Sequence, residues 1–256
     1  MIESELDHED LRVYRAAIGF VAWLEDEISG IANNLSASEH LARASGGIPV
    51  NIAQASGKRS ANERRQYIDT AYGSSLECAA CLDVMGVLAN LHAENVDGGK
   101  ERLATLVSML IGFRKSAGMQ MREDGAEYVA VGIDDARVWF DHERLDVYQM
   151  ALNLVVWYGK LGDDPEALPR TAAKSLDRAS TSVVLNIAEG NGKFSIKDRC
   201  RFISHARTAA LQLAAIIDVL AARKVESIMR YGPEGKRCLA NIVRMLIGWE
   251  RSLEKR

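Results

Sequence analysis

Two ten-residue stretches of the chain combine polar side chains and glycine in a way that could support chemistry. The first is NIAQASGKRS at residues 51–60, and the second is NIAEGNGKFS at residues 186–195. Each stretch follows an apolar run and places an Asn three residues before a Gln or a Glu. This polar insertion could be a catalytic device, a phosphate-binding loop or a structural signature, and the choice decides whether the chain is an enzyme.

The GNGK segment at residues 190–193 is similar to the end of a phosphate-binding loop. Such a loop has the pattern GxxxxGK[ST] and follows a strand, so that backbone amides surround the phosphates. Here Ile187 stands in the place of the first Gly and Phe194 in the place of the Ser or Thr, and the preceding pattern is helical. The glycines are therefore predicted to end a helix, where a residue with positive φ is favoured.

Two further patterns could bind a metal or carry redox chemistry. Cys78 and Cys81 form a CxxC pair, which is found in thiol redox pairs and in zinc sites. His8 and His142 each lie in a DHE triplet before a helix, where acidic residues suit the helix dipole. The chain does not carry the two Glu-x-x-His pairs with which di-iron bundles bind metal. We therefore expect no metal and no cofactor.

The elements that must position these residues are helices. The chain has 256 residues, enough for two ordinary domains, and its 48% apolar and 26% charged residues are typical of a globular protein. Only four prolines occur, and abundant Ala and Leu favour helix formation. No run of about 18 uncharged apolar residues predicts a membrane span. The acidic start of the chain does not have the order of a signal peptide, so we expect a cytoplasmic protein.

The net charge of −3 provides no overall attraction to nucleic acid, but basic residues form two clusters at equivalent places. Solvated helix faces often have this charge pattern, and direct RNA or DNA binding is the alternative interpretation. The possible nucleic-acid-binding residues are Lys58, Arg59, Arg64, Arg65, Lys193, Lys197, Arg199 and Arg201.

The chain is an internal duplication. Three segment pairs align without gaps, and the offset between the copies drifts only from 134 to 136 residues. The pairs are residues 7–23 with 141–157, residues 41–53 with 176–188, and residues 109–113 with 245–249.

Each copy is predicted to contain four amphipathic helices. Apolar residues in the first helix follow the i, i+3, i+4, i+7 spacing, as from Tyr14 to Ile28. Capping boxes predict helix starts at Ser36, Ser60 and Ser195, and the last helices are expected to follow NVDGGK and YGPEGK, with Pro233 in a first turn. The predicted fold is all-α, with two tandem antiparallel up-down four-helix bundles. The predicted boundaries are residues 1–117 for the first bundle, 118–140 for a linker and 141–256 for the second bundle.

The duplication also changes the interpretation of the cysteines. Cys78 and Cys81 align with Leu213 and Ile216 on the predicted buried face of the third helix. Free cysteine readily replaces a small apolar side chain in a core. We therefore predict core packing rather than redox or zinc chemistry.

A set of polar residues lies beside the apolar face of the second helix and reaches the third helix. Each copy holds one acid and one amide near an Arg, whereas acid–base catalysis by two carboxylates needs both acids in one site. We predict a structural hydrogen-bonded network, with a ligand or RNA contact as the alternative. Its members are Arg43, Asn51, Gln54, Glu77, Arg178, Asn186, Glu189 and Gln212.

At several of these positions the chain resembles the ribosomal-RNA intervening-sequence proteins. The resemblance rests on Tyr148, Ala151 and the RAS…NIAEGNGK pattern from Arg178 to Lys193, and it is weaker in the first copy. The family consists of small bacterial four-helix bundles and includes the accessory variability proteins of diversity-generating retroelements. The resemblance implies ring-shaped homo-oligomers and no catalytic activity. In the retroelement branch it implies binding to a reverse transcriptase and to RNA through basic residues.

We therefore predict a non-enzymatic binding or scaffolding module. It is expected to form a homo-oligomer or to pair its two bundles within the chain. It is also expected to bind an unidentified protein, with a nucleic-acid-linked process such as a reverse-transcriptase accessory role as the context. Direct RNA or DNA binding is the alternative, and an enzyme with a polar pocket in the bundle core is the third hypothesis. No membrane partner is expected.

Overall fold

The computed structural model describes residues 6–28, 35–89, 91–117, 138–162 and 168–254. Within these residues the chain forms α-helices and short 3₁₀ helices, and no strand occurs. The elements of the first bundle are η1 (Asp7–Asp10), α1 (Arg12–Glu27), α2 (Ser36–Ser56), α3 (Ala61–Leu88) and α4 (Ala93–Ser116). Those of the second bundle are η2 (Asp141–Arg144), α5 (Asp146–Gly162), α6 (Arg170–Gly192), α7 (Ile196–Ala222) and α8 (Glu226–Glu254).

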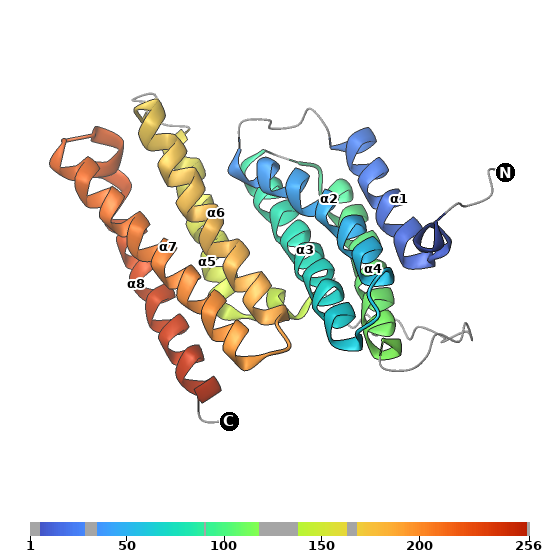
Figure 1. Ribbon diagram of the computed structural model, residues 1–256. Helices are drawn as coiled ribbons and strands as arrows, with labels where there is room; N and C mark the ends of the chain where they lie inside the picture. Colours follow the sequence, from blue (N-terminus) through green and yellow to red (C-terminus); the bar gives the residue numbers. More distant parts are fainter. Residues whose placement is uncertain (1–5, 29–34, 90, 118–137, 163–167, 255–256) are drawn as a thin grey trace.

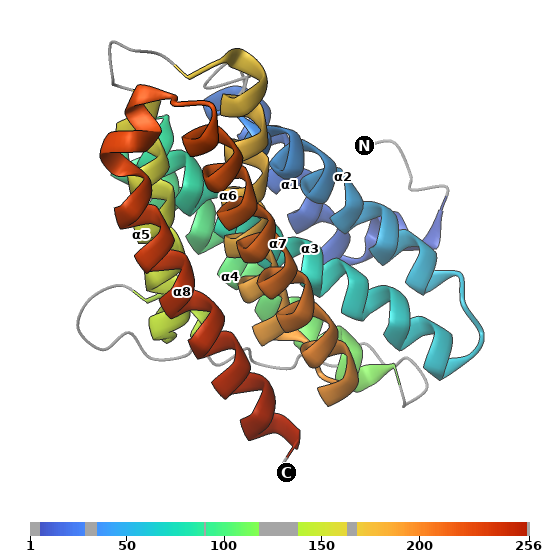
Figure 2. The same ribbon diagram turned by 90° about the vertical axis from the view of Figure 1, so that its left-hand side faces the viewer.

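The helices form two four-helix units that lie side by side (Figure 1). In each unit every helix contacts the next one, and the first helix also contacts the fourth. The second bundle packs through α5 and α6 onto α2 and α3 of the first (Figure 2). The prediction of an all-α protein with two four-helix units is confirmed.

The apolar spacing explains which face each helix buries. In α8 the side chains of Leu239, Ile242, Leu246 and Leu253 recur at three-, four- and seven-residue steps, and all are buried. Two of the predicted caps are present, since Ser60 Oγ accepts from the backbone N–H of Glu63 at 3.5 Å and Ser195 Oγ from that of Asp198 at 3.4 Å.

The predicted starts of the last helices were wrong. NVDGGK and YGPEGK lie inside α4 and α8, which begin earlier, and Pro233 is inside α8 rather than in its first turn. The glycines of these segments allow close packing: a Cβ at Gly99 would lie 2.9 Å from the Trp23 ring, and one at Gly235 would lie 2.5 Å from the Trp157 ring. This contact with a Trp outweighs the low helix propensity of glycine.

The predicted linker at residues 118–140 falls mostly outside the described residues, and the domain boundaries stay a prediction. Its last residues, from Val138, are described. Phe140 is buried, and the indole Nε1 of Trp139 donates to Asp97 Oδ1 at 3.3 Å. The chain therefore packs against the first bundle before it enters the second.

The two cysteines of the CxxC pair are core residues. Cys78 and Cys81 are fully buried in α3, and burial raises the pKa of both thiols well above the ordinary value. A thiol with a raised pKa is a poor nucleophile and a poor metal ligand. The predicted core position of this pair is confirmed.

By length and composition alone, α7 could cross a membrane. A core helix passes the same test, and α7 buries Ile203, Leu213 and Leu220 in its own bundle. It is also apolar on a second, exposed face, where Leu211 and Val219 lie. Its composition therefore reflects two apolar faces and does not distinguish it from a core helix.

Candidate functional site at the junction of the two bundles

The backbones of the two bundles come close where the end of α6 meets α3. A Cβ added at Gly192 would contact the Leu76 side chain, with its Cγ 3.4 Å away, and would lie 2.9 Å from Tyr72 Cε1. Neither Gly190 nor Gly192 has a positive φ, so the predicted reason for these glycines was wrong. Gly192 ends α6 where α3 leaves no room for a side chain, whereas Gly190 packs against α7, where an added Cβ would lie 3.0 Å from Phe202 Cβ.

A group of four ionisable side chains lies largely buried at this junction, and we call it the junction cluster. It consists of Asp83 on α3, Lys100 on α4, Glu143 on η2 and Tyr148 on α5. The Lys100 ammonium contacts the Asp83 carboxylate and lies 3.1 Å from Glu143 Oε1. Tyr148 donates its hydroxyl to Asp83 Oδ2 at 2.7 Å. Each bundle thus contributes two members, and their bonds cross the junction.

The electrostatics of the junction cluster keep its lysine charged and its tyrosine protonated. Burial opposes the charge of Lys100, but Asp83 and Glu143 outweigh burial and raise the lysine pKa. Burial raises the pKa of Glu143, against the effect of Lys100, and burial together with Asp83 raises that of Tyr148 well above its ordinary value. Tyr148 therefore remains a hydrogen-bond donor, as a buried hydroxyl beside a carboxylate must.

His142 lies beside the junction cluster and is fully buried, and both of its ring nitrogens lack a hydrogen-bond partner within the described part of the chain. Burial, and next the charge of Lys100, lower the pKa of this histidine to about 3. The neutral ring stacks on Phe140 at 5.6 Å and meets the Tyr148 ring edge-on at 4.7 Å. His142 therefore acts as an aromatic core residue.

The ligand atoms of Asp83, His142 and Glu143 lie within 4.8 Å of one another, a spacing that could hold a metal ion. The ammonium of Lys100 already contacts both carboxylates of this set. It therefore supplies the positive charge that a cation would otherwise provide.

A second contact across the junction holds the start of α2. The backbone N–H of Ser36 donates to Asp177 Oδ2 on α6 at 2.7 Å. Burial raises the pKa of Asp177, and the bond from Ser36 opposes the rise. The predicted capping box of Ser36 with Glu39 was wrong, because α2 has no side-chain cap of its own and the carboxylate comes from the other bundle.

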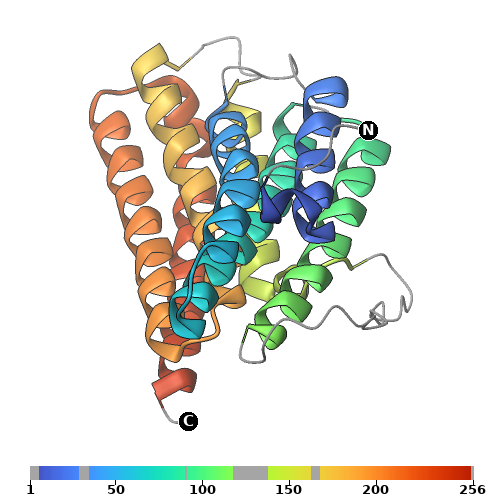
Figure 3. The same cartoon turned by 45° about the vertical axis from the view of Figure 1, so that its right-hand side comes forward.

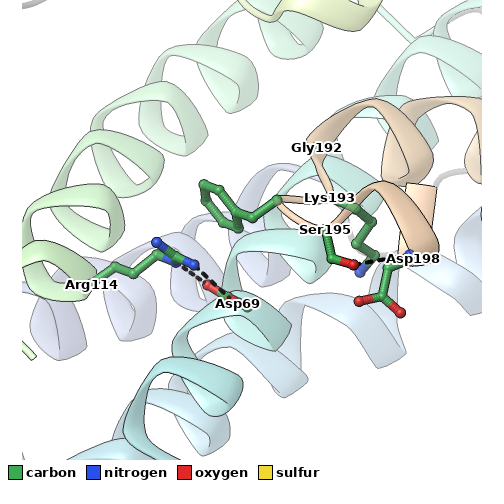
Figure 4. A pocket seen from close by; sticks show the side chains of 7 residues that line it. Asp69, Arg114, Gly192, Lys193, Ser195 and Asp198 are labelled. Carbon is green, nitrogen blue, oxygen red and sulfur yellow. Dashed lines mark hydrogen bonds and ion pairs between the residues drawn. The ribbon is translucent and has the colours of Figure 1, made fainter. Parts of the chain in front are cut away.

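A polar cavity of about 290 Å³ lies at one end of the junction (Figure 4). Arg114 of α4 forms an ion pair with Asp69 of α3, with 2.5 Å between Nε and Oδ1. The Arg114 guanidinium also lies 3.9 Å from the ring centroid of Phe194, which belongs to the α6–α7 connection. Lys193 and Asp198 complete the opposite wall.

The structure places the two predicted basic clusters at the same end of the molecule, at the α2–α3 and α6–α7 connections (Figure 3). Half of their members form the corners between helices. Arg64 and Arg199 each donate to the backbone carbonyl of the residue six positions earlier, at 2.8 and 2.9 Å. Lys58 lies over the Tyr67 ring, and Lys193 pairs with Glu189 at 2.7 Å. The exposed members are Arg59, Arg65, Lys197 and Arg201.

The predicted polar network is present as separate local contacts. Arg43 and His40 both bond to Glu77, at 3.2 and 2.7 Å. Asn51 and Asn186 each donate to the backbone carbonyl four residues earlier in their own helix, at 2.7 Å. The other members, which include Gln54, Arg178 and Gln212, are exposed, except for Glu189, which pairs with Lys193. The structural role of the set stays a prediction.

The sequence interpretation missed Asp83 and Lys100 and did not recognise the role of Glu143. A signal was present in the duplication: an Asp in the third helix and a Lys in the fourth recur as Asp218 and Lys236. Neither pair lies in a recognised motif, so only a position-by-position comparison of the copies could have found them.

The comparisons with known proteins agree with the duplication. The family described as 23S rRNA-intervening sequence protein matches residues 9–112 and again residues 143–248. None of the curated proteins and none of the solved structures matches the chain. Since the two matches together cover most of the sequence, the chain belongs to this family, with one family unit in each bundle.

Proposed function

We propose that this tandem member of the 23S rRNA-intervening sequence protein family is a non-enzymatic scaffold that self-associates and binds a protein partner in a nucleic-acid-linked process. The observation that supports the proposal is the junction cluster. Asp83, Lys100, Glu143 and Tyr148 bond to one another between the bundles. These four side chains therefore hold the two bundles together through their mutual bonds.

The accessibility of these groups argues against catalysis. A general acid or base must reach its substrate directly or through one water molecule. The side chains of Lys100, Asp83 and Glu143 are buried, with exposed fractions of 8%, 12% and 10%. The thiols of Cys78 and Cys81 are buried as well, and the family is not known for enzymatic activity.

Sedimentation velocity of the purified chain tests the self-association. We expect the mean mass to rise above that of one chain between about 1 and 100 µM, the range in which contacts with micromolar Kd become populated. A mass of one chain throughout this range would contradict the scaffold proposal. The resemblance to retroelement accessory proteins makes a reverse transcriptase the first partner to test by co-sedimentation.

Direct binding of RNA or DNA is the second candidate function. It is favoured by the arrangement of the basic clusters, whose exposed members Arg59, Arg65, Lys197 and Arg201 come from both bundles but lie at one end of the molecule. Charges gathered in this way can contact several phosphates of one strand. The overall charge of −3 opposes such binding.

Fluorescence anisotropy with a labelled RNA hairpin at low and moderate salt tests this candidate. Binding through phosphates should weaken steeply as salt increases and should be lost when Arg59, Arg65, Lys197 and Arg201 are changed to Glu. The matched control reverses four charges at the other end of the second bundle, at the start of α6 and just after α7: Arg170, Lys174, Arg223 and Lys224, which are exposed. Failure to bind at low salt would exclude nucleic-acid binding and would leave the scaffold proposal untouched.

A further inference from the structure

The second bundle carries an exposed copy of the ion pair that is buried at the junction. Asp218 on α7 and Lys236 on α8 occupy the positions of Asp83 and Lys100, and their side chains are 2.6 Å apart. The exposed fractions are 65% and 40% for this pair, but only 12% and 8% for Asp83 and Lys100. Both bundles therefore contain the ion pair, but only the pair of the first bundle is covered by a neighbouring bundle.

The apolar residues around the pair are repeated in the same way. Leu76, Ala80 and Val84 of α3 are buried under the second bundle, and their counterparts on α7 are Leu211, Ala215 and Val219. All three counterparts are exposed, with Leu211 55% exposed against 3% for Leu76. A cavity of about 370 Å³ with mainly apolar walls lies on this face, between α6 and α7. We call this surface the acceptor face.

The first bundle carries the opposite half of the same contact. Leu6, Glu9, Tyr14 and Val50 occupy the positions of Phe140, Glu143, Tyr148 and Leu185, which the second bundle places against the first. Phe140, Tyr148 and Leu185 are buried, whereas Leu6 and Val50 are exposed and Tyr14 is half-buried. His8 even meets the Tyr14 ring edge-on at 4.8 Å, as His142 meets Tyr148. We call this surface the donor face.

We infer that the acceptor face of one chain binds the donor face of a second copy of the same chain, in the arrangement that joins the two bundles within one chain. In this contact Lys236 lies between Asp218 and the Glu9 of the second copy, and Tyr14 of that copy donates its hydroxyl to Asp218. The apolar side chains of the two faces cover one another. The inference rests on the proposed scaffold function and names its partner and surfaces.

The complementarity of the exposed groups favours a second copy of the chain over other occupants. A lipid surface would have to desolvate the Asp218–Lys236 pair and would give it no third partner. The donor face supplies a carboxylate and a hydroxyl at the positions that the buried pair uses.

The two faces lie on opposite sides of the folded molecule, as the positions of α1 and α7 show in Figure 1. A single chain therefore cannot bring its own faces together while its bundles remain joined. The contact is head-to-tail, and such contacts produce a closed ring if the rotation returns to the start and a growing filament if it does not.

The contact between chains has fewer interactions than the junction. The carboxylate of Asp177, which caps α2, has Ala42 as its counterpart, and Phe194, which lies against Arg114, has Arg59. Two of the interactions across the junction thus have no equivalent between chains. We expect separate chains to associate reversibly, while the bundles of one chain remain joined.

A charge-reversal pair tests the inference by sedimentation velocity. Lys236→Glu places a second carboxylate beside Asp218 and opposite Glu9, and it should weaken association by about tenfold or more. Glu9→Lys should weaken it by about as much, and the double variant should restore most of the association. Arg251→Glu, which changes the charge equally at an exposed site in the last turn of α8, is the control and should associate like the wild type.

Disulfide trapping tests the geometry independently. The close approach of Gly192 to Leu76 predicts that Gly57 of one chain meets Leu211 of the next, so the Gly57→Cys, Leu211→Cys variant should form disulfide-linked multimers. The intrachain control is Gly192→Cys with Leu76→Cys, which should form a disulfide without joining chains. Both are made with Cys200 and Cys238 changed to Ala.

The outcomes separate the two proposals. Association that persists without rescue by the double reversal and without the Gly57–Leu211 disulfide would overturn these faces and leave the scaffold function intact. A chain that remains single at every concentration would overturn both. Rescue together with the interchain disulfide would establish the contact.

Discussion

The two Asp–Lys pairs of this protein have the same residues at equivalent helix positions but different surroundings. The pair of Asp83 and Lys100 is buried and gains Glu143 and Tyr148 as partners, whereas the pair of Asp218 and Lys236 faces solvent. An exposed pair contributes little to stability, while removal of one member of a buried pair leaves a charge without compensation. The difference shows that the packing of a second bundle, and not the residue types, decides what an ion pair does.

The largest expected difference follows from removing the lysine of each pair. Lys100→Met leaves Asp83 and Glu143 buried without their cation and should lower the free energy of unfolding by about 3–5 kcal/mol. Lys236→Met should change it by less than about 1 kcal/mol. Urea unfolding at a concentration where the chain is monomeric measures both values. Equal effects of the two substitutions would show that the junction cluster is not buried in solution.

The second-largest difference in stability is expected between substitutions of the tyrosines at equivalent positions of the two copies, Tyr148 and Tyr14. Tyr148→Phe removes the donor to a buried carboxylate and should cost about 1.5–3 kcal/mol, the range for hydrogen bonds to charged groups. Tyr14 is its half-buried counterpart in the first bundle, so Tyr14→Phe should cost less than about 0.5 kcal/mol in the monomer. The same unfolding measurement applies. A Tyr148→Phe variant as stable as the wild type would mean that Asp83 finds another donor.

The histidines of the two copies should differ in their effect on pH dependence. The folded-state pKa of His142 is about 3, below the ordinary value, so the unfolded chain binds its proton first as pH falls. Between the folded-state and the unfolded-state pKa, acidification lowers the free energy of unfolding. The protonation of His142 should lower it by about 2 kcal/mol between pH 7.5 and pH 5. The His142→Leu variant does not lose this contribution. Between pH 7.5 and pH 5 its free energy of unfolding should therefore rise by this amount relative to that of the wild type.

The charged neighbours of His142 set the controls for this experiment. Lys100 disfavours the charged ring, and the raised pKa of Glu143 acts in the opposite direction, because a folded state that holds its proton more tightly gains stability as pH falls. That contribution is common to the wild type and the variant and cancels in their difference. His8→Leu is the matched variant at the equivalent position of the first copy, where the ring is only half-buried. A constant difference for His142→Leu would contradict a neutral buried ring.

The smallest effect concerns a contact that only the junction contains. Ala42→Asp introduces, on the donor face, the carboxylate that Asp177 provides for the start of α2 within the chain. In the next chain it would face the start of α6, near Thr171, and a cap of this kind contributes about 1 kcal/mol. Sedimentation should show association several times tighter than in the wild type. Ala42→Asn, which is also a good cap but uncharged, should give a similar gain. If neither substitution tightens association, the two faces do not meet in the inferred arrangement.

Local patterns predicted much of the fold. The apolar spacing of the helices and the caps at Ser60 and Ser195 depend on neighbouring residues, and they were correct. The core position of Cys78 and Cys81 followed from the duplication, because equivalent positions share their surroundings within a bundle. Predictions failed where a contact with a distant residue overrides the local preference, as at Ser36, which Asp177 caps, and at Gly99, which packs on Trp23.

The candidate site was largely invisible for the same reason. The basic clusters and the NIAQ and NIAEG segments can be recognised in the sequence because their residues are neighbours along the chain. The junction cluster is assembled from four elements, with Asp83 and Glu143 separated in the sequence by all of α4 and by the residues that follow it. No spacing rule within a helix brings such residues together.

By itself the sequence determined that this protein is all-helical, that it contains two copies of one four-helix unit, and which face of each helix is apolar. These properties depend on residues a few positions apart, and the backbone period converts them directly into structure. Only the tertiary structure decided which of two equivalent surfaces is covered. The copies carry the same Asp, Lys and apolar residues on that surface, and the burial of one of them depends on how the second bundle packs against the first.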